Sequence, residues 1–275
     1  MIKFLKFTFC FFLLLFLAGG SFWFFSVRPK TPSNDRNWST DQAVLPEIAI
    51  EGDSVSVKNI RNFSYTSETE YTPRYYDRTF PLSEVETAWY MVEPLSKIGI
   101  AHTLVSFGLR DGSYLSVSIE IRKEKGEIFS PLRGLLREYE LMYVIADEQD
   151  VIKLRSNYRH DDVYLYKLNL PPEKVREYLV SLLQSADDFR AHPRFYNTLT
   201  HNCTSELVSH ANILSPGRIP WSIKTLLPTY SAKLAYDLGL LDRTLSFEEL
   251  EQKSHINERA LKYAADPDFS RRIRE

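Results

Sequence analysis

The sequence predicts an α+β domain that follows a single N-terminal membrane helix. Three observations support this fold class: residues 7–27 carry no charge, residues 101–122 alternate apolar and polar side chains as paired strands do, and residues 171–186 repeat apolar side chains at helical spacing. The chain has 275 residues, of which 44% are hydrophobic and 25% are charged. This is enough to bury one substantial core or two small ones.

The N-terminal segment has the length and composition of a membrane span. Lys3 and Lys6 precede the uncharged run 7–27, which as a helix with ~1.5 Å rise per residue would cover roughly 30 Å of hydrocarbon. The small residues at 18–21 are of the kind that a signal peptidase accepts, whereas the aromatic residues at 22–25 favour an uncleaved anchor with an interfacial belt. The short basic N-terminus favours a tail in the cytoplasm and a domain outside it.

This topology divides the chain into three regions. We expect residues 1–30 to be a membrane anchor or signal, residues 31–60 to be a spacer that leads into the fold, and residues 61–275 to form the domain outside the cytoplasm. The predicted location is the cytoplasmic (inner) membrane, which the chain crosses once.

Two alternating runs on either side of Asp111-Gly112-Ser113 predict an antiparallel hairpin. A three-residue turn at 111–113 would pair His102 with Arg122 and place the odd-numbered apolar residues of both strands on one face. The other face then carries polar side chains, with Glu120 one diagonal from His102; it consists of His102, Ser106, Ser116, Ser118 and Glu120. A histidine beside a carboxylate is a candidate base with its orienting group, and the alternative is an ordinary solvated strand face.

The remaining segments supply the scaffold. Residues 134–154 mix strand and helix signals, and residues 163–170 alternate as a strand does. Residues 171–186 begin with proline and glutamate and carry apolar side chains on one face, which predicts a helix. Ser246 and Glu249 form a capping box for a further helix that runs to about residue 264.

Cys203 is one of two cysteines, and the other, Cys10, lies in the apolar N-terminal run. A domain outside the cytoplasm meets oxidising conditions, so Cys203 is a lone thiol where a structural cysteine normally has a partner. One interpretation is an inert core residue, because Cys203, Leu207, Ala211 and Leu214 fall on one helical stripe.

The other interpretation is a nucleophile. Asn202 is a good N-cap residue and would place Cys203 in a first helical turn, where unpaired N–H groups and the helix dipole favour a thiolate and can bind an oxyanion. We expect this helix to meet the polar face of the hairpin, with His102 as the base. Asn202 and Tyr139 are candidates for oxyanion-binding or site-lining residues, and simple packing is the alternative for Tyr139.

Charge and composition argue against a nucleic-acid partner and against a metal site. Lys and Arg number 34 against 36 Asp and Glu, which gives a formal net charge of -2, and no dense basic stripe is present, so nucleic acid is not an expected partner. The six histidines form no His-x-x-x-His motif, and the cysteines form no Cys-x-x-Cys pair. We therefore expect no metal and no cofactor.

Several ordered motifs resemble the Lnb-type N-terminal periplasmic domain family, formerly catalogued as a domain of unknown function. The motifs are RNWSTDQAVLP (36–46), IRNFSY (60–65), AHTLVSFGLRDGSYLSVSIEIRKEKGE (101–127), REYELMYVIADEQDVIKLR (137–155) and FYNTLTHNCTSELVSHAN (195–212). Proteins that it resembles include a bacterial lipoprotein N-acyltransferase. The order histidine, polar residue, cysteine is similar to that of circularly permuted papain-like thiol enzymes.

This resemblance implies a papain-like catalytic domain in the periplasm, with Cys203, His102 and Glu120 as its catalytic residues. The implied function is a membrane-anchored, cysteine-dependent acyltransferase that passes an acyl thioester on Cys203 to an amine, as in lipoprotein N-acylation. A membrane lipid would be the acyl donor, and a lipoprotein or peptide the acceptor. Two alternatives stay open: a cysteine peptidase or amidase that acts on cell-wall peptide, and a non-catalytic periplasmic binding module.

Overall fold

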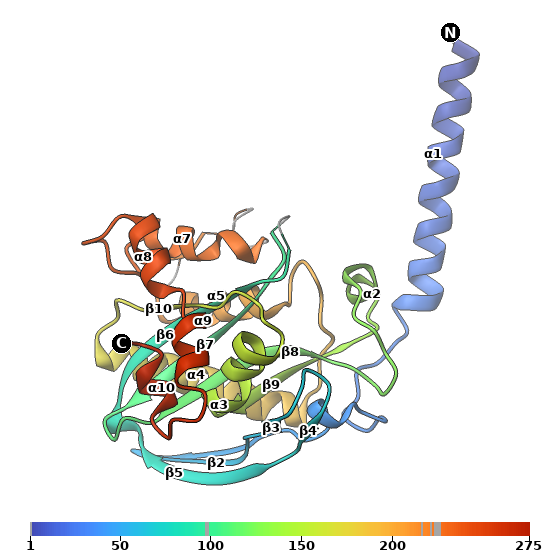
Figure 1. Cartoon of the computed structure of the whole chain (residues 1–275). Coiled ribbons are helices and arrows are strands. Elements are labelled where there is room, and N and C mark those ends of the chain that lie inside the picture. Colours follow the sequence, from blue (N-terminus) through green and yellow to red (C-terminus); the bar gives the residue numbers. More distant parts are fainter. Residues whose placement is uncertain (1, 97–98, 216, 221, 223–226) are drawn as a thin grey trace.

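The computed structural model describes residues 2–96, 99–215, 217–220, 222 and 227–275. A long helix, α1 (Ile2–Phe22), continues as the short helix η1 (Trp23–Val27) and projects from a globular body (Figure 1). Within the described residues, Lys6–Val27 is the one helix long and apolar enough to cross a membrane. The expected N-terminal apolar helix is confirmed.

The body is built on an eight-stranded sheet with the order β1-β2-β9-β8-β7-β6-β10, in which β5 also pairs with β2. The neighbours are antiparallel except β2 and β9, which are parallel. The strands are β1 (Glu47–Glu51), β2 (Ser54–Arg61), β5 (Tyr75–Pro81), β6 (Val85–Pro94), β7 (Ala101–Leu109), β8 (Tyr114–Arg122), β9 (Glu140–Ala146) and β10 (Tyr164–Lys167). A separate pair joins β3 (Ser64–Tyr65) and β4 (Tyr71–Thr72). The α+β class is confirmed.

The sheet begins earlier in the chain than expected. β1 and all of β2 except Arg61 lie within residues 31–60, the range predicted to be a spacer that leads into the fold, and Val55, Val57 and Ile60 of β2 are fully buried. These residues are apolar at the positions where β2 packs into the core. The folded domain begins before β1, since Trp38 and Gln42 are already buried and Trp38 forms a bridge with Glu124.

The β7–β8 hairpin has the predicted faces but a different register. Gly108 pairs with Tyr114 and Leu104 with Ser118, so the register is shifted by two residues from the predicted one. The cause is a turn one position earlier than predicted: Leu109 N–H bonds Ser113 O, so the turn is at residues 110–112, and Gly112 adopts φ 83°, a conformation that favours glycine. Because the shift is even, every side chain keeps its predicted face.

Helices cover both faces of the sheet (Figure 1). α4 (Pro172–Ala191) and α5 (Cys203–Leu214) pack on the face that carries the odd-numbered apolar residues of the hairpin. The opposite face is covered by α3 (Glu148–Lys153), η4 (Leu154–Tyr158), α9 (Asn257–Lys262) and α10 (Phe269–Arg272). The shorter helices are η2 (Thr40–Gln42), η3 (Leu82–Glu84), α2 (Pro131–Leu135), η5 (Pro228–Tyr230), α7 (Ser231–Asp237) and α8 (Phe247–Ser254).

The predicted scaffold segments are present with adjusted bounds. The expected helix at 171–186 is α4, and the expected strand at 163–170 contains the shorter β10. Ser246 and Glu249 form the predicted capping box, but the helix that follows is interrupted. It breaks into α8 and α9 because Ile256 turns into the core and its N–H bonds Val163 O.

Asp150 is a fully buried carboxylate that ties the first strands to α3. It accepts hydrogen bonds from Arg61 Nε and Nη2, from Phe63 N–H and from the Tyr65 hydroxyl, at 2.8–3.1 Å. Asp150→Asn would remove the carboxylate that pairs directly with the buried Arg61 guanidinium, so we expect a loss of about 3–5 kcal/mol in the free energy of unfolding. Denaturant unfolding of the detergent-solubilised chain, followed by tryptophan fluorescence, measures the change.

Asp162→Asn is the matched control, since Asp162 forms an exposed ion pair with His255. We expect a change below about 1 kcal/mol there. Equal unfolding midpoints for the two variants would show that the Asp150 pair does not stabilise the fold.

Candidate active site

Cys203 is the first residue of α5, as predicted. The Asn202 side chain accepts from Ser205 N–H at 2.9 Å and donates to Thr198 O at 2.9 Å, and Ser205 Oγ accepts from Asn202 N–H at 2.8 Å. These contacts hold the Asn202 side chain in place through its Oδ1 and one of its two Nδ2 hydrogens. Within the described chain, the N–H groups of Cys203 and Thr204 make no hydrogen bond and are the donors available at this helix start.

The Cys203 side chain is nearly buried and points toward its own neighbour. Its Sγ lies 3.9 Å from Thr204 Oγ1, which in turn lies 3.0 Å from Thr103 Oγ1 on β7. Cys203 and Leu207 belong to the core on the odd-numbered face of the sheet. The prediction that α5 meets the even-numbered polar face is therefore wrong, because the apolar stripe of α5 packs against the apolar face of the hairpin.

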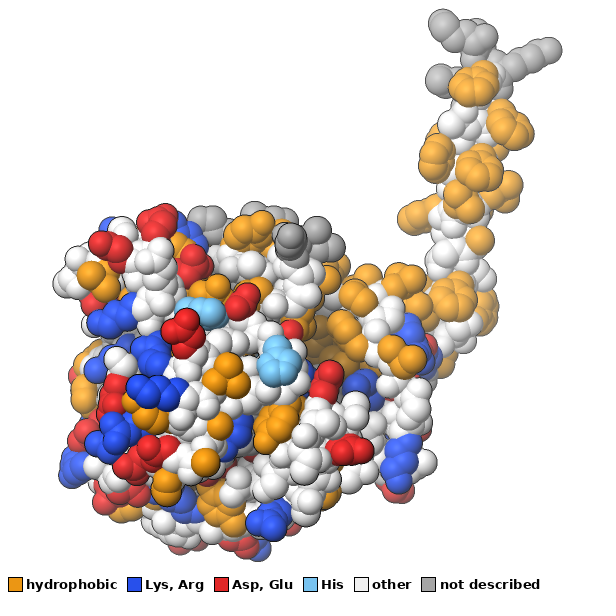
Figure 2. Space-filling model, viewed as in Figure 1, with side chains coloured by type: hydrophobic (Ala, Val, Ile, Leu, Met, Phe, Trp, Pro, Cys, Tyr) orange, Lys and Arg blue, Asp and Glu red, His pale blue; other side chains and the backbone are white. Residues whose placement is uncertain are grey.

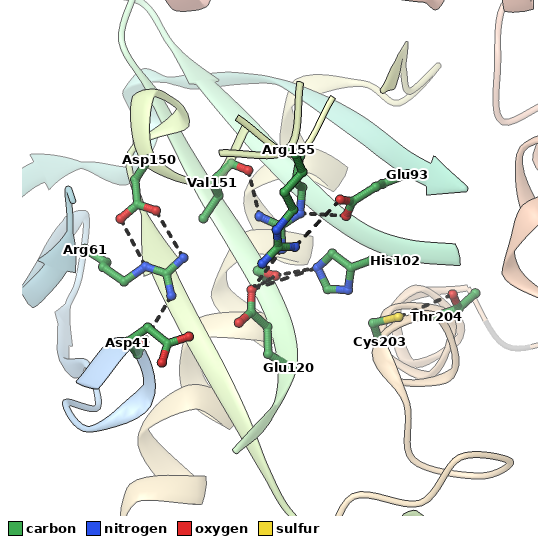
Figure 3. A network of polar contacts seen from close by, with 12 residues as sticks. Asp41, Arg61, Glu93, His102, Glu120, Asp150, Val151, Arg155, Cys203 and Thr204 are labelled. Atoms are coloured by element: carbon green, nitrogen blue, oxygen red, sulfur yellow. Dashed lines mark hydrogen bonds and ion pairs between the residues drawn. The ribbon is translucent and has the colours of Figure 1, made fainter. Parts of the chain in front are cut away.

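His102 and Glu120 come together, but a serine lies between them. Ser118 Oγ is 2.9 Å from His102 Nε2 and donates to Glu120 Oε1 at 2.8 Å, whereas His102 Nε2 and Glu120 Oε1 are 4.0 Å apart. Arg155, from η4, donates to Glu120 at 3.2 Å and to Glu93 at 2.8 Å (Figure 3). The shifted register brings Glu120 level with His102, where one diagonal was predicted. Ser118 forms hydrogen bonds with both side chains and bridges them.

Two arginines and burial set the charge of this cluster. Burial acts to raise the pKa of Glu120, but the guanidinium groups of Arg61 and Arg155 outweigh it and hold that pKa well below its ordinary range. Burial, reinforced by Arg155 and only partly opposed by Glu120, lowers the pKa of His102 to about 3. Glu120 is therefore ionised and His102 neutral near neutral pH.

These charges fix the histidine tautomer. An ionised Glu120 only accepts hydrogen bonds, so the single Ser118 hydroxyl hydrogen goes to it. Ser118 Oγ must then accept from His102, which places the ring proton on Nε2 and the lone pair on Nδ1. In the described structure Nδ1 makes no hydrogen bond and is not sealed from solvent. His102 Nδ1 is therefore the ring nitrogen with the free lone pair.

The structure does not join His102 to Cys203. Across the described residues, no hydrogen bond links Sγ to the His102 ring. His102 lies beyond Leu104↔Ser118, the last pair of the β7–β8 ladder, and in the view of Figure 3 its ring lies between Glu120 and the start of α5. Cys203 and His102 therefore lie toward the same end of β7 and β8 without a hydrogen bond between them in the described structure.

An apolar cavity of about 120 Å³ follows α5 from its first turn to its last. Thr204 and Ser215 both line it, and they are about 16 Å apart along a helix of 1.5 Å rise per residue. Most of the other lining residues are apolar; they include Val105, Leu168, Leu170, Leu207, Val208, Ala211, Leu214, Leu234, Ala235 and Leu238. Exposed Ser215 and Arg218 mark the open end. Thr204 lines the inner end, whereas its neighbour Cys203 is not among the described residues that line the cavity.

The sequence model of the Lnb N-terminal periplasmic domain family matches residues 71–229, more than half of the chain. The chain belongs to this family. Cys203, His102 and Glu120 all lie within the matched residues of the Lnb domain. Comparison with curated proteins and with solved structures gives no match, so the papain-like permutation has no structural neighbour to support it. The periplasmic family and helix α1 fit a single-pass membrane protein with a periplasmic domain.

Tyr139 and Asn202 have structural roles in the Lnb domain. The fully buried Tyr139 donates its hydroxyl hydrogen to Ile128 O at 2.7 Å and accepts from Ser130 N–H at 3.0 Å, so it fixes the turn before α2. Asn202 caps α5 as described above. Within the described chain, no group of three or more His, Cys, Asp or Glu side chains is arranged to hold a metal ion.

Sequence reasoning assigned no role to Ser118, Arg155 or Thr204. Ser118 had a detectable signal, because residues two apart on a strand share a face and Ser118 precedes Glu120 by two. No sequence pattern pointed to Arg155, since it reaches Glu120 from a helix 35 positions further along the chain. None pointed to Thr204 either, because its contact with Thr103 depends on how α5 docks on the sheet.

Proposed function

We propose that this Lnb domain is a membrane-anchored thiol acyltransferase in which Cys203 carries the acyl group. The observation that carries the proposal is the apolar cavity along α5, which is lined at its inner end by Thr204, whose Oγ1 lies 3.9 Å from Cys203 Sγ. Such a cavity suits an alkyl chain, whereas a peptide would leave buried polar groups without partners. The donor is a lipid of the membrane that holds α1, and the acceptor is the amine of a lipoprotein or peptide.

The chemistry uses groups of the chain alone. Cys203 Sγ attacks the ester carbonyl of the lipid while His102 Nδ1 takes the thiol proton, and the first-turn N–H groups bind the oxyanion. His102 then returns the proton to the departing alcohol, which leaves a thioester. An acceptor amine attacks the thioester, loses its proton to His102 and regenerates the thiol. Substrate binding must bring Nδ1 and Sγ together, as catalytic hydrogen bonds often tighten only in the complex.

A second candidate is a non-catalytic module that binds acyl chains in the same cavity. The missing hydrogen bond between Sγ and His102 in the described structure favours it. Both candidates need the cavity, but only the enzyme needs the thiol. A peptidase or amidase that acts on cell-wall peptide would use the same residues without the cavity.

Ala211→Phe tests whether the cavity holds the acyl chain, because Ala211 lines it midway along α5. If the ring excludes two methylenes at about 0.8 kcal/mol each, the preference for dioctanoyl over dipalmitoyl phosphatidylglycerol should rise about tenfold. The measurement is the rate at which each lipid acylates a diacylated lipopeptide with a free N-terminal amine, followed by mass spectrometry. Ala191→Phe, at the exposed end of α4, is the control and should keep the wild-type preference.

If Ala211→Phe leaves the preference between the two lipids unchanged, the cavity does not hold the acyl chain in the reaction. Cleavage of cell-wall peptide by the wild type, without any acyl transfer, would replace the proposal with the amidase.

A further inference from the structure

Four apolar side chains stand exposed in and around α2. Ile128 and Leu132 are 79% and 65% exposed, and Leu199 and Phe129 are exposed beside them. We call these four residues the α2 patch. Figure 2 shows apolar side chains gathered over α2, next to the base of α1. Clustered apolar exposure of this kind marks an interaction surface, whereas single exposed residues are ordinary.

The α2 patch is held in a fixed shape. The buried hydroxyl of Tyr139 bonds both Ile128 O and Ser130 N–H. Thr198 Oγ1 donates to Pro131 O at 2.7 Å, which attaches the segment that carries Leu199. These bonds order a turn whose apolar side chains have no cover in the described chain. Their exposure is therefore built into the fold.

The same region binds the end of the membrane helix. Val27 is buried, Arg137 Nη1 donates to Arg28 O at 3.1 Å, and Lys30 pairs with Glu138. The Arg137 guanidinium lies 5.8 Å from the Trp23 ring centroid. Figure 1 shows α2 beside the base of α1. Wherever α1 enters the bilayer, the α2 patch is carried to that surface.

We propose that the α2 patch is a second membrane contact, which seats in the interfacial layer of the bilayer that α1 crosses. A lipid surface fits better than a protein partner, because the patch is continuous with the membrane end of α1 and is flanked by Arg137 and by Arg133, which pairs with Glu127.

The contact also positions the reaction centre. Thr198 bonds α2 through its hydroxyl and accepts from Asn202 through its carbonyl, and Asn202 caps the helix that Cys203 begins. Two short links therefore connect the lipid-facing turn to the nucleophile. Insertion of the α2 patch holds the Cys203 end of α5 near the bilayer, and it does so whether or not the domain transfers acyl groups.

Depth measurement in vesicles tests the contact directly. The probe is the full chain with Cys10→Ser, Cys203→Ser and Leu132→Cys, labelled with nitrobenzoxadiazole and reconstituted into phosphatidylglycerol and phosphatidylethanolamine vesicles. We expect blue-shifted emission and several-fold quenching by lipids with a doxyl group near the head. Leu261→Cys is the matched control, because Leu261 is 55% exposed on α9, across the domain from α1. Equal quenching at both positions overturns the proposal.

A second arm separates insertion from simple proximity to α1. The label is placed at Leu199→Cys, and Ile128→Asp with Leu132→Asp is added. Charges in an inserted patch would lift it from the bilayer, so quenching at position 199 should fall several-fold, whereas Leu261→Asp should leave it unchanged. Quenching that survives the two aspartates would mean that α1 alone holds the domain at the surface, and the proposal fails. Neither arm measures acyl transfer, so the membrane contact can be confirmed or overturned independently of the proposed function.

Discussion

Cys203→Ser will abolish the acyl label that the wild-type chain takes from a radiolabelled phospholipid. In the proposed reaction the label is a thioester, which hydroxylamine releases rapidly, whereas amides and the serine ester resist it. A hydroxyl is also a much weaker nucleophile than the thiol in this position. We expect the hydroxylamine-sensitive label to fall at least about a hundredfold, near the limit of detection. The measurement is gel radiography of the detergent-solubilised chain before and after hydroxylamine treatment.

Cys10→Ser is the matched control, since Cys10 is the other cysteine and lies in α1. It should keep the wild-type label, and a diacylated lipopeptide with a free amine should then discharge that label. Equal labelling of both serine variants would assign the domain to the non-catalytic candidate, as would a wild type that takes no label and cleaves no cell-wall peptide.

His102→Gln should slow thioester formation by about 10²–10⁴-fold, which is the usual contribution of a positioned general base. Ser118→Ala should slow it by a smaller factor, because the ring would remain while Nε2–H lost the acceptor that fixes the tautomer. Ser118→Thr keeps the hydroxyl and should restore much of the rate. Single-turnover labelling with the phospholipid donor measures all three variants, and His192→Gln, at an exposed histidine on the far end of α4, is the control.

The pH dependence checks the charge of the base. Because the pKa of His102 is lowered to about 3, the imidazole stays neutral from pH 5 to pH 8. The ratio of wild-type to His102→Gln rates should therefore be constant over that range. An ordinary imidazole would protonate below about pH 6.5, and the ratio would shrink as the pH falls. A ratio that shrinks in this way would contradict the neutral base.

Short-range features of this chain could be predicted because neighbouring residues decide them. The α5 helix begins at Cys203 since the Asn202 side chain caps the turn that directly follows it, and the Ser246–Glu249 box starts α8 in the same way. Alternation placed the hairpin side chains on their faces, because a strand has a period of two. The length and apolar composition of the uncharged N-terminal run were enough to predict α1.

Long-range packing decided the rest. The face on which α5 docks depends on which apolar surfaces fit together, and the odd-numbered face was the one that could bury Leu207. The hairpin register depended on a turn one position earlier than the sequence suggested, and that register made Ser118 the link between His102 and Glu120. Arg155, and the cavity between α4, α5 and α7, depend on segments that meet only in the folded chain. The sequence by itself determined which residue types carry the chemistry and where α5 begins. Only the tertiary structure decided their contacts, because distant segments come together through burial of shared apolar surface, which no local pattern encodes.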